Sequence, residues 1–458
     1  MAASRGRLVV GAPGTGSGKT TATLALIAGL KAQGLRVQAF KCGPDYIDGT
    51  YHAVLTGRPV RNLDLWMGGP DDARRQVARG MQQADLGVVE GVMGLLDSGA
   101  PDGVAASTAD VARAIGAPVV LVVDASRMAE SVAAIVHGFD ALSGAPGIAG
   151  VIFNRVASAG HRALLEGALR RHTRVPALGY LPEMAELAMP ERHLGLVPAV
   201  ERQALAARMH RWADVTQKTI DWDALLAIAR GAAPAPTVSG GSDARHASHP
   251  PVPVALARDE ALHFYYPANL ELLEELGAVL LPFSPVRGEP IPAEARMLYA
   301  GGGYPEMFLG ELGQSAAALA SYRERIQGGL LTLAECGGYM WLAESLAAGA
   351  DPVPLVGAVP ATMRIASRLQ AIGYRTVSAL PGGPFPAGTT FRGHEFHHGR
   401  VVESRALQAA WHSRSRGGPG SERAEGVLTA TLVGGFTHLY LPSNPGAVAA
   451  LLDKARAS

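Results

Sequence analysis

Short hydrophobic runs alternate with stretches of helical periodicity along the first half of the chain. The β-rich runs are RLVVGA, RVQAFK, LGVVEG, PVVLVVD, IAGVIFNRV and VPALGYLP, and helical patterns span residues 19–33 and 131–142. Strands and helices in alternation are typical of βαβ units, in which a parallel sheet carries helices on both faces. The pattern therefore predicts a doubly wound α/β domain over residues 1–230.

A second α/β series follows a segment without periodicity. Residues 231–251 are rich in Pro, Ala, Gly and Ser, which predicts a flexible linker. The runs after it are VPVALARD, GAVLLPFSP, RMLYAGGGYPE and LLTLAE, which predict a second doubly wound domain over residues 252–458. Two later stretches, GTTFRGHEFHHGRV and GVLTATLVGGFTHLYLPS, look more antiparallel, so we expect a mixed second sheet.

Composition and charge narrow the classes of function. The 458 residues include 41 basic and 40 acidic side chains, and a net charge of +1 indicates neither a nucleic-acid nor a membrane partner. Two cysteines cannot form a disulfide framework and suit a reducing compartment. The sequence has no uninterrupted apolar stretch long enough for a membrane-spanning helix. We therefore expect a cytoplasmic protein, and the sequence leaves a homodimer open.

A glycine-rich turn follows the first hydrophobic run, in LVVGAPGTGSGKTTATLALIAGL, and opens a helix. Its residues of interest are Gly14, Gly16, Gly18, Lys19 and Thr20. Glycines let backbone amides curl around phosphate oxygens, the helix N-terminus adds its positive dipole, and the lysine reaches the outer phosphates. The threonine hydroxyl suits Mg²⁺. The usual spacing would place the first glycine where this chain has Pro13. The strand–loop–helix context predicts a site for a nucleoside triphosphate with Mg²⁺.

Four carboxylates follow strands of the same domain. Asp45 and Asp48 lie in FKCGPDYIDGTYH, and Glu90 and Asp97 lie in LGVVEGVMGLLD. Ligands of open α/β sheets bind at the carboxyl ends of strands, where these acids fall. Because Mg²⁺ prefers carboxylate oxygens, Glu90 is a candidate ligand, either directly or through water. Helix capping or a surface position is the alternative for each acid, and Cys42 is expected to be a packing residue.

A cysteine stands at a tight corner in LLTLAECGGYMWLAES. Cys336 follows a predicted strand, with Ala334 two residues before it and Gly338 two residues after it. This spacing is typical of a nucleophile elbow, a strained strand-to-helix turn that would point the sulfur into solvent. The amide of Gly337 would then face a developing oxyanion. The alternative is an inert cysteine packed in a glycine turn.

A nucleophilic cysteine also needs a second oxyanion donor and a base. Gly302 and Gly303, in YAGGGYPE, end another strand and are candidates for the donor. His438, in GGFTHLYLPS, lies near the end of the late strand series and is the best-placed base. The competing histidines, in RGHEFHHG, are His394, His397 and His398.

Eight stretches, in matching order over nearly the whole chain, together resemble the cobyrinic acid a,c-diamide synthases and the closely similar hydrogenobyrinic acid a,c-diamide synthases. They are GAPGTGSGKTT, FKCGPDYIDGTYHAVLTGRPVRNLD, VVEGVMGLLD, FNRV, ARDEALHFYYPANLELLEELGA, PFSP, GGGYPE and AECGGYMWL. The resemblance implies an N-terminal domain like dethiobiotin synthetase and a C-terminal class I glutaminase domain. In such enzymes ammonia from L-glutamine attacks acyl phosphates that ATP forms on the a and c acetates of a corrinoid polycarboxylate.

Carried over position by position, the resemblance implies Cys336 as the nucleophile and His438 as its activating histidine. Lys19 and Thr20 match the phosphate-loop pair. The expected metal ligands are Thr20, Asp45 and Glu90, the expected substrate contacts are Asp45, Tyr46, Asp48 and Asp97, and Asn154 is an expected nucleotide contact. Ordinary class I glutaminases carry a Glu two residues after the histidine, where this chain has Tyr440. The family lacks that Glu, which predicts a weakly oriented histidine and a slow glutaminase until partner substrates bind.

Three alternatives remain at the level of sequence. A relative that amidates nickel sirohydrochlorin on the same side chains shares both motifs. A cobyric acid synthase fits the GPDYID stretch less well. A nucleotide-switch protein of the partitioning type would carry a second lysine where this chain has Gly14, and its second domain would be an inert binding module.

Overall fold

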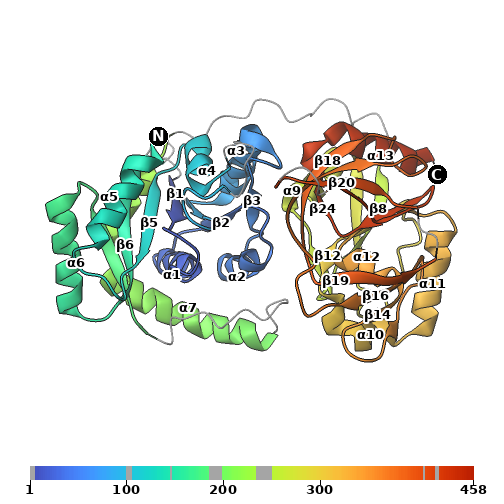
Figure 1. Cartoon of the computed structure of the whole chain (residues 1–458), viewed down its shortest axis with the longest axis horizontal. Helices are drawn as coiled ribbons and strands as arrows, with labels where there is room; N and C mark the ends of the chain where they lie inside the picture. Colours follow the sequence, from blue (N-terminus) through green and yellow to red (C-terminus); the bar gives the residue numbers. More distant parts are fainter. Residues whose placement is uncertain are drawn as a thin grey trace. The chain divides into compact units, whose positions relative to one another are not determined.

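The computed structural model of the protein describes residues 6–98, 106–144, 147–184, 199–233, 250–405, 408–417 and 422–457. These residues form two compact units, one ending at residue 233 and the other beginning at residue 250 (Figure 1). Most of the predicted linker, residues 234–249, lies outside the described residues. The predicted domain limits therefore stay predictions.

The first unit is built on a seven-stranded parallel sheet. Its strand order is β3-β2-β4-β1-β5-β6-β7. The strands are β1 (Gly6–Gly11), β2 (Val37–Cys42), β3 (Arg61–Leu63), β4 (Leu86–Glu90), β5 (Val119–Asp124), β6 (Ile148–Val156) and β7 (Ala177–Pro182). The predicted runs are confirmed as strands, and β1, β2 and β4 are buried along their whole length because helices cover both faces.

Helices on the two faces give the first unit two separate cores. Along β1, Val9 packs into one core while Leu8 and Val10 pack into the other, as the two-residue repeat of a strand requires. One face carries α1, α7 and α8, and the opposite face carries α3 to α6 (Figure 1). The helices are α1 (Lys19–Ala32), α2 (Ile47–Thr56), α3 (Gly69–Gly80), α4 (Thr108–Ile115), α5 (Val132–Ser143), α6 (Ala159–His172), α7 (Ala199–Thr219) and α8 (Trp222–Arg230).

The register of three neighbouring strands determines where the polar residues of the first unit meet. Val10 of β1 and Lys41 of β2 are both paired with Glu90, the last residue of β4. The glycine-rich turn follows β1 directly. Parallel pairing therefore brings the turn, Lys41 and Glu90 to the same carboxyl edge of the sheet.

The second unit contains a six-stranded sheet of order β10-β8-β11-β13-β23-β22. Its strands are β8 (Val252–Ala257), β10 (Ala278–Phe283), β11 (Met297–Ala300), β13 (Leu331–Glu335), β22 (Val427–Leu428) and β23 (Leu432–Gly435). All pairs are parallel except β22 with β23, so the expectation of a mixed sheet is confirmed at this edge. The helices are α9 (Pro267–Glu275), α10 (Leu309–Gly313), α11 (Ala316–Gln327), α12 (Gly337–Trp341) and α13 (Pro445–Ala457).

Most of the antiparallel strands form separate sheets. A five-stranded sheet, β21-β20-β17-β18-β24, consists of β17 (Ala371–Ala379), β18 (Thr390–His397), β20 (Trp411–Ser415), β21 (Arg423–Glu425) and β24 (His438–Tyr440). A four-stranded sheet consists of β14 (Ala343–Ala347), β15 (Val353–Pro354), β16 (Val359–Ile365) and β19 (Gly399–Ser404). The short β12 (Gly302–Gly303) pairs with β9 (Leu262–Phe264). Pairing of β18 with β24 sets His394 opposite His438.

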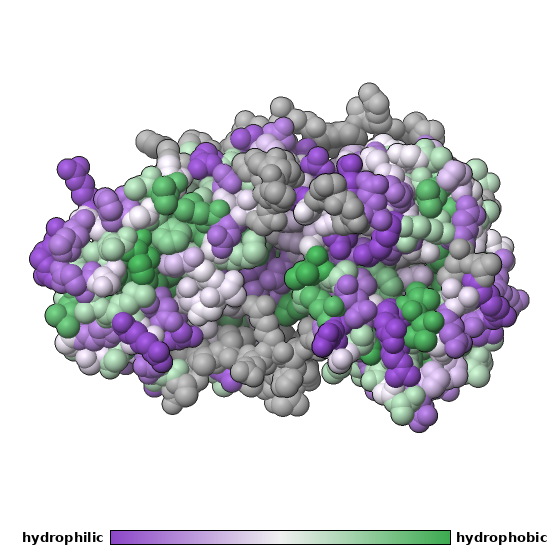
Figure 2. Space-filling view, viewed as in Figure 1, coloured by the Kyte–Doolittle hydropathy of each residue, from purple (hydrophilic) through white to green (hydrophobic). Residues whose placement is uncertain are grey.

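Hydrophobic residues on the visible surface of each unit form small groups among hydrophilic ones (Figure 2). Four buried clusters hold the large apolar side chains of the described chain, two in each unit. Within the residues that the structure describes, we find no helix with the length and apolar character needed to cross a membrane.

Candidate functional site

The glycine-rich turn of the first unit joins β1 to the N-terminus of α1. Gly16 and Gly18 adopt φ angles of 85° and 89°, which glycine reaches without steric cost. A Cβ on Gly18 would lie 2.0 Å from the Asn154 amide nitrogen, whereas one on Gly14 or Gly16 would meet nothing within 4 Å. Helix α1 has no acidic residue in its first turn, so its positive end remains available to an anion. The turn has the backbone geometry of a phosphate loop.

The side chains of Lys19 and Asn154 contact the backbone of this turn. The Lys19 ammonium donates hydrogen bonds to the carbonyl of Gly14, at 3.2 Å, and to that of Met93. The Asn154 amide, on β6, donates to the carbonyl of Ser17 at 3.1 Å. The predicted nucleotide contacts are thus brought together at one end of the sheet.

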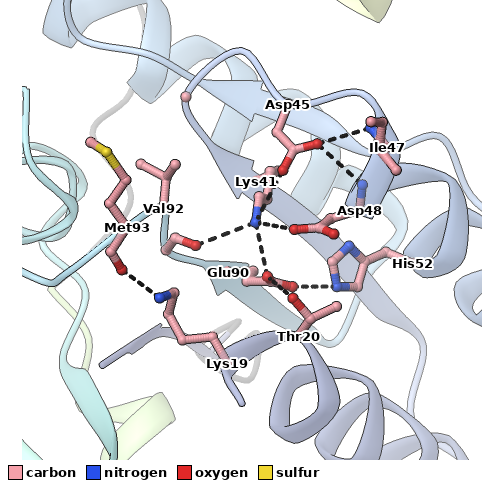
Figure 3. Close-up of polar contacts among 12 residues, drawn as sticks. Lys19, Thr20, Lys41, Asp45, Ile47, Asp48, His52, Glu90, Val92 and Met93 are labelled. Atoms are coloured by element: carbon pink, nitrogen blue, oxygen red, sulfur yellow. Dashed lines mark hydrogen bonds and ion pairs between the residues drawn. The ribbon is translucent and has the colours of Figure 1, made fainter. Parts of the chain in front are cut away.

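A buried lysine is surrounded by acids beside the phosphate loop (Figure 3). The Lys41 ammonium donates to one carboxylate oxygen of Asp48 and one of Glu90, each at 2.8 Å, and forms an ion pair with Asp45 at 3.6 Å. His52 Nε2 lies 2.7 Å from the second oxygen of Glu90. We call these five residues the Lys41 cluster. Three of the four predicted acids therefore converge on one cation.

The Lys41 cluster is charged despite its burial. Burial opposes the charge on Lys41, but Glu90, Asp48 and Asp45 raise the pKa of its ammonium above the ordinary value. Burial likewise opposes ionisation of Glu90, while Lys41 and His52 together lower the pKa of that carboxyl below its usual range. Glu90 is fully buried, so its charge depends on these partners.

The predicted metal ligands are partly brought together. The Thr20 hydroxyl donates to Glu90 at 2.7 Å, which places two hard oxygen donors next to the phosphate loop. Asp45 instead accepts hydrogen bonds from the amides of Ile47 and Asp48 and so also caps α2. Among the described residues, no three His, Cys, Asp or Glu side chains form a metal-holding group. The donor set fits Mg²⁺ bound by one hydroxyl and one carboxylate, with phosphate oxygens and water completing the shell.

The other predicted residues of the first unit have simpler surroundings. Asp97 accepts a hydrogen bond from the Gly94 amide at 2.8 Å and shapes the loop after β4. Tyr46 immediately precedes α2, next to the acids of the Lys41 cluster. Cys42 is buried in the core, as expected for a packing residue.

Lys41 and His52 were not predicted as site residues. Lys41 stands in the run VQAFKC, all six residues of which are buried, and His52 is fully buried on α2. A lysine inside a buried strand is the signal that would have identified the first of them, because unpaired charges are almost never buried.

Cys336 lies at the turn between β13 and α12, with φ 46° and ψ −102°. Among the described non-glycine residues, Met93 and Arg155 are the others with a positive φ. A Cβ on Gly338 would lie 2.2 Å from the Ala300 carbonyl oxygen, so only glycine allows the turn to pack on the end of β11. The elbow geometry expected for Cys336 is present.

The expectation that the elbow points the sulfur into solvent is wrong. Cys336 is only 5% exposed, because the loop after β11 packs closely over the turn. Burial raises the pKa of the thiol, and the nearby carboxyl of Glu306 adds to the effect. Burial also raises the pKa of Glu306 to about 7. A thiol in this setting needs a base to become a thiolate.

The glycine loop connects the cysteine turn with His438. A Cβ on Gly337 would lie 2.7 Å from the Gly303 amide nitrogen, and one on Gly302 would lie 2.2 Å from Cε1 of His438. The predicted nucleophile, glycine loop and base therefore share one buried site. Burial, with a smaller effect from His397, lowers the pKa of His438 to about 3, so its ring is neutral near pH 7.

The three competing histidines have different neighbours in the structure. The His394 ring stacks on His438 with centroids 4.8 Å apart and planes at 13°. His397 stacks on Phe436 instead, and His398 lies 3.2 Å from the carbonyl of Ala366. Of the three, His394 is the one that contacts the predicted base.

The two units are thus a phosphate-loop unit and a cysteine–histidine unit, and the comparisons with known proteins agree. Residues 8–197 match the CobQ/CobB/MinD/ParA nucleotide binding domain, and residues 253–445 match the CobB/CobQ-like glutamine amidotransferase domain. The protein is a nucleotide-binding glutamine amidotransferase, an enzyme of the ligase type.

Curated relatives narrow the class to one family. The chain is 40% identical to the cobyrinate a,c-diamide synthase of Priestia megaterium, covering 99% of this chain and 98% of that protein. It is 38% identical to the hydrogenobyrinate a,c-diamide synthase of Streptomyces coelicolor, with the same coverage of both chains. It is 36% identical to the cobyrinate a,c-diamide synthase of Salmonella typhimurium over 97% of both chains. The chain belongs to the family of cobyrinate and hydrogenobyrinate a,c-diamide synthases.

Proposed function

We propose that the protein amidates the a and c acetate side chains of cobyrinic or hydrogenobyrinic acid, using ATP and L-glutamine. The observation that carries the proposal is the buried site of Cys336, Gly302–Gly303 and His438 on a chain that also has a phosphate loop. Amidation requires an activated carboxylate and a source of ammonia, and the two units supply these two needs. The relatives from Priestia megaterium and Streptomyces coelicolor, at 40% and 38% identity, support the choice of a corrinoid.

The cysteine unit would release ammonia from glutamine. His438 takes the proton of the Cys336 thiol, and the thiolate attacks the carboxamide carbon of glutamine, which yields a thioester as ammonia leaves. The amides of Gly337 and of Gly302 or Gly303 are the proposed donors to the oxyanion. Water then hydrolyses the thioester to glutamate.

The first unit would activate each acetate. The N-terminus of α1 and Lys19 hold the phosphates, so that the terminal phosphoryl group can pass to a substrate carboxylate and form an acyl phosphate. Ammonia then displaces phosphate to give the amide. Thr20 and Glu90 would hold Mg²⁺, which neutralises phosphate charge when bound. Asp45, Tyr46, Asp48 and Asp97 are the proposed substrate contacts.

Three macrocycles test the proposal. Purified enzyme receives ATP, Mg²⁺ and glutamine with hydrogenobyrinic acid, cobyrinic acid or nickel sirohydrochlorin, and mass spectrometry follows the conversion of carboxylates to carboxamides. We expect diamide from a corrinoid, and the faster substrate identifies the preferred ring. If nickel sirohydrochlorin alone gave a diamide, the protein would instead be a nickel-sirohydrochlorin a,c-diamide synthase. No amide on any ring, despite ATP binding, would overturn the proposal.

A further inference from the structure

Side chains of strand β18 contact three consecutive residues, Phe436, Thr437 and His438. The ring of His397 stacks on Phe436, with centroids 4.1 Å apart and planes at 6°. The Thr437 hydroxyl donates to Glu395 at 2.9 Å. His394, the strand partner of His438, stacks on it in turn. The GHEFHHG stretch thus makes one contact with each residue of segment 436–438, which ends with the predicted base, His438.

Two arginines hold Glu395, the residue that contacts Thr437. Glu395 is fully buried, and its second oxygen accepts hydrogen bonds from Arg375 at 3.1 Å and from Arg423 at 2.7 Å. Two guanidinium groups compensate the buried carboxylate, so Glu395 can hold Thr437 without an unpaired charge. The backbone just before His438 is therefore fixed by a charged network.

The start of α9 fixes the same region from another side. The Tyr266 hydroxyl lies 2.9 Å from Nδ1 of His394, and Tyr266 is fully buried. The Asn269 side chain donates to the carbonyl of Leu439 and accepts from the amide of Leu441, at 2.8 and 2.9 Å. These contacts leave the His394 ring little freedom to rotate, and the backbone after His438 is equally restrained.

We infer that His394, held by Tyr266, is the positioning residue that orients His438 in place of the carboxylate of ordinary class I glutaminases. The inference rests on the proposed glutaminase function. An orienting group must fix the plane of the catalytic imidazole and tolerate the positive charge that forms when it accepts the thiol proton. A flat neutral ring, stacked in parallel, meets both requirements, because it fixes the plane of the His438 ring and brings no positive charge of its own. The aromatic side chain of Tyr440 occupies the usual carboxylate position in sequence and packs edge-on to Tyr266, with centroids 5.3 Å apart.

His394 is suited to this role only while it is neutral. Burial, with a smaller effect from His438, lowers the pKa of His394 well below its ordinary value. A second imidazolium at this distance would oppose protonation of His438 instead of stabilising it.

Four variants test the inference in the full-length enzyme, with ATP and corrinoid present. His394→Leu should lower kcat of glutamine hydrolysis by about tenfold to a hundredfold and leave KM for glutamine unchanged, because a poorly oriented base loses part of the roughly 10²–10⁴-fold that general acid–base catalysis contributes. His394→Phe, which retains a flat ring, should lose less than His394→Leu. Tyr266→Phe should lose only a few-fold. The matched control is His412→Leu on β20 of the same sheet, where the half-exposed imidazole faces Glu422, and it should retain full activity.

The nitrogen source separates this inference from the proposed function. Amidation driven by ammonium salts should be unchanged in every variant, since it bypasses Cys336. If Cys336→Ala retained glutamine-driven amidation, the proposed function itself would fail. If Cys336→Ala lost it while His394→Leu kept the wild-type kcat, the positioning role alone would be wrong. An equal loss of ammonium-driven amidation in His394→Leu would also count against the positioning role. So would a raised KM for glutamine with an unchanged kcat. If His394→Leu does not fold, His394→Phe and Tyr266→Phe decide, and wild-type kcat in both overturns the inference.

Discussion

Replacement of Lys41 by Met should destabilise the first unit strongly. The substitution keeps the length and most of the volume of the side chain but removes the ammonium that lies 2.8 Å from Asp48 and from Glu90. Each contact is worth about 6 kcal/mol by Coulomb's law at an effective dielectric constant of about 20. Desolvation of the lysine offsets several kcal/mol of that sum. Because Asp48 and Glu90 then lose the ammonium that both of them contact, we expect a loss of about 3–5 kcal/mol in the free energy of unfolding.

Hydrogen exchange measured by mass spectrometry on the full chain can test this value unit by unit. Peptides from β2 and β4 report the stability around Lys41, while peptides from β8 and β11 report the second unit and should not change. Lys31→Met on α1 is the matched control, because the Lys31 ammonium is only half-buried and donates to the carbonyl of Leu55. We expect that control to stay within about 0.5 kcal/mol of the wild type.

A second variant tests the cause. Adding Asp48→Asn to Lys41→Met removes one of the uncompensated charges, so the double variant should be more stable than Lys41→Met. The reasoning is refuted if Lys41→Met is as stable as the wild type, or if the double variant is less stable than the single one. Loss of the same stability in the second unit would point to general unfolding instead.

Three further predictions concern single residues. Burial raises the pKa of Glu335 to about 8, so the native state keeps a proton that the unfolded chain loses above about pH 4.5. As the pH rises between those values, this proton should lower the stability of the second unit by about 1.4 kcal/mol per pH unit, and Glu335→Gln should remove this contribution to the slope in calorimetry. Gly18→Ala places a Cβ 2.0 Å from Asn154 at a positive φ, and calorimetric titration should show weakened ATP binding. Gly302→Ala displaces the His438 ring, so glutamine-driven amidation should fall while ammonium-driven amidation remains.

Matched glycines provide the controls for the last two predictions. A Cβ at Gly138 on α5 or at Gly310 on α10 would meet nothing within 4 Å. Gly138→Ala should leave ATP binding intact, and Gly310→Ala should leave both nitrogen sources usable. Normal ATP binding in Gly18→Ala, or normal glutamine use in Gly302→Ala, would contradict the close contacts on which these predictions depend.

Local patterns were sufficient to predict most of the fold. The strands of the first sheet follow hydrophobic runs, because a sheet covered on both faces requires apolar residues along each inner strand. The phosphate loop and the cysteine turn are contiguous motifs, so glycine spacing alone indicates their geometry. Gly338 stands where the turn passes too close to the Ala300 backbone for any side chain, and Gly18 combines a positive φ with the nearby Asn154 amide.

Residues that depend on tertiary pairing could not be predicted in the same way. Lys41 meets Glu90 only because β2 and β4 are neighbours, although α2, β3 and α3 separate them in the chain. His394 meets His438 because β18 and β24 pair, and nothing in GHEFHHG says which histidine will face the base. The burial of Cys336 arises from the loop after β11, which lies about thirty residues earlier in the chain.

The backbone of Cys336 has a consequence for how this family can change during evolution. A non-glycine residue at φ 46° and ψ −102° carries strain of about 1–3 kcal/mol, which glycine would relieve. Selection for the thiol therefore opposes selection for stability at this position. In a lineage that came to rely on free ammonia, replacement of Cys336 by glycine would be favoured by stability alone, and loss of the glutaminase would become hard to reverse.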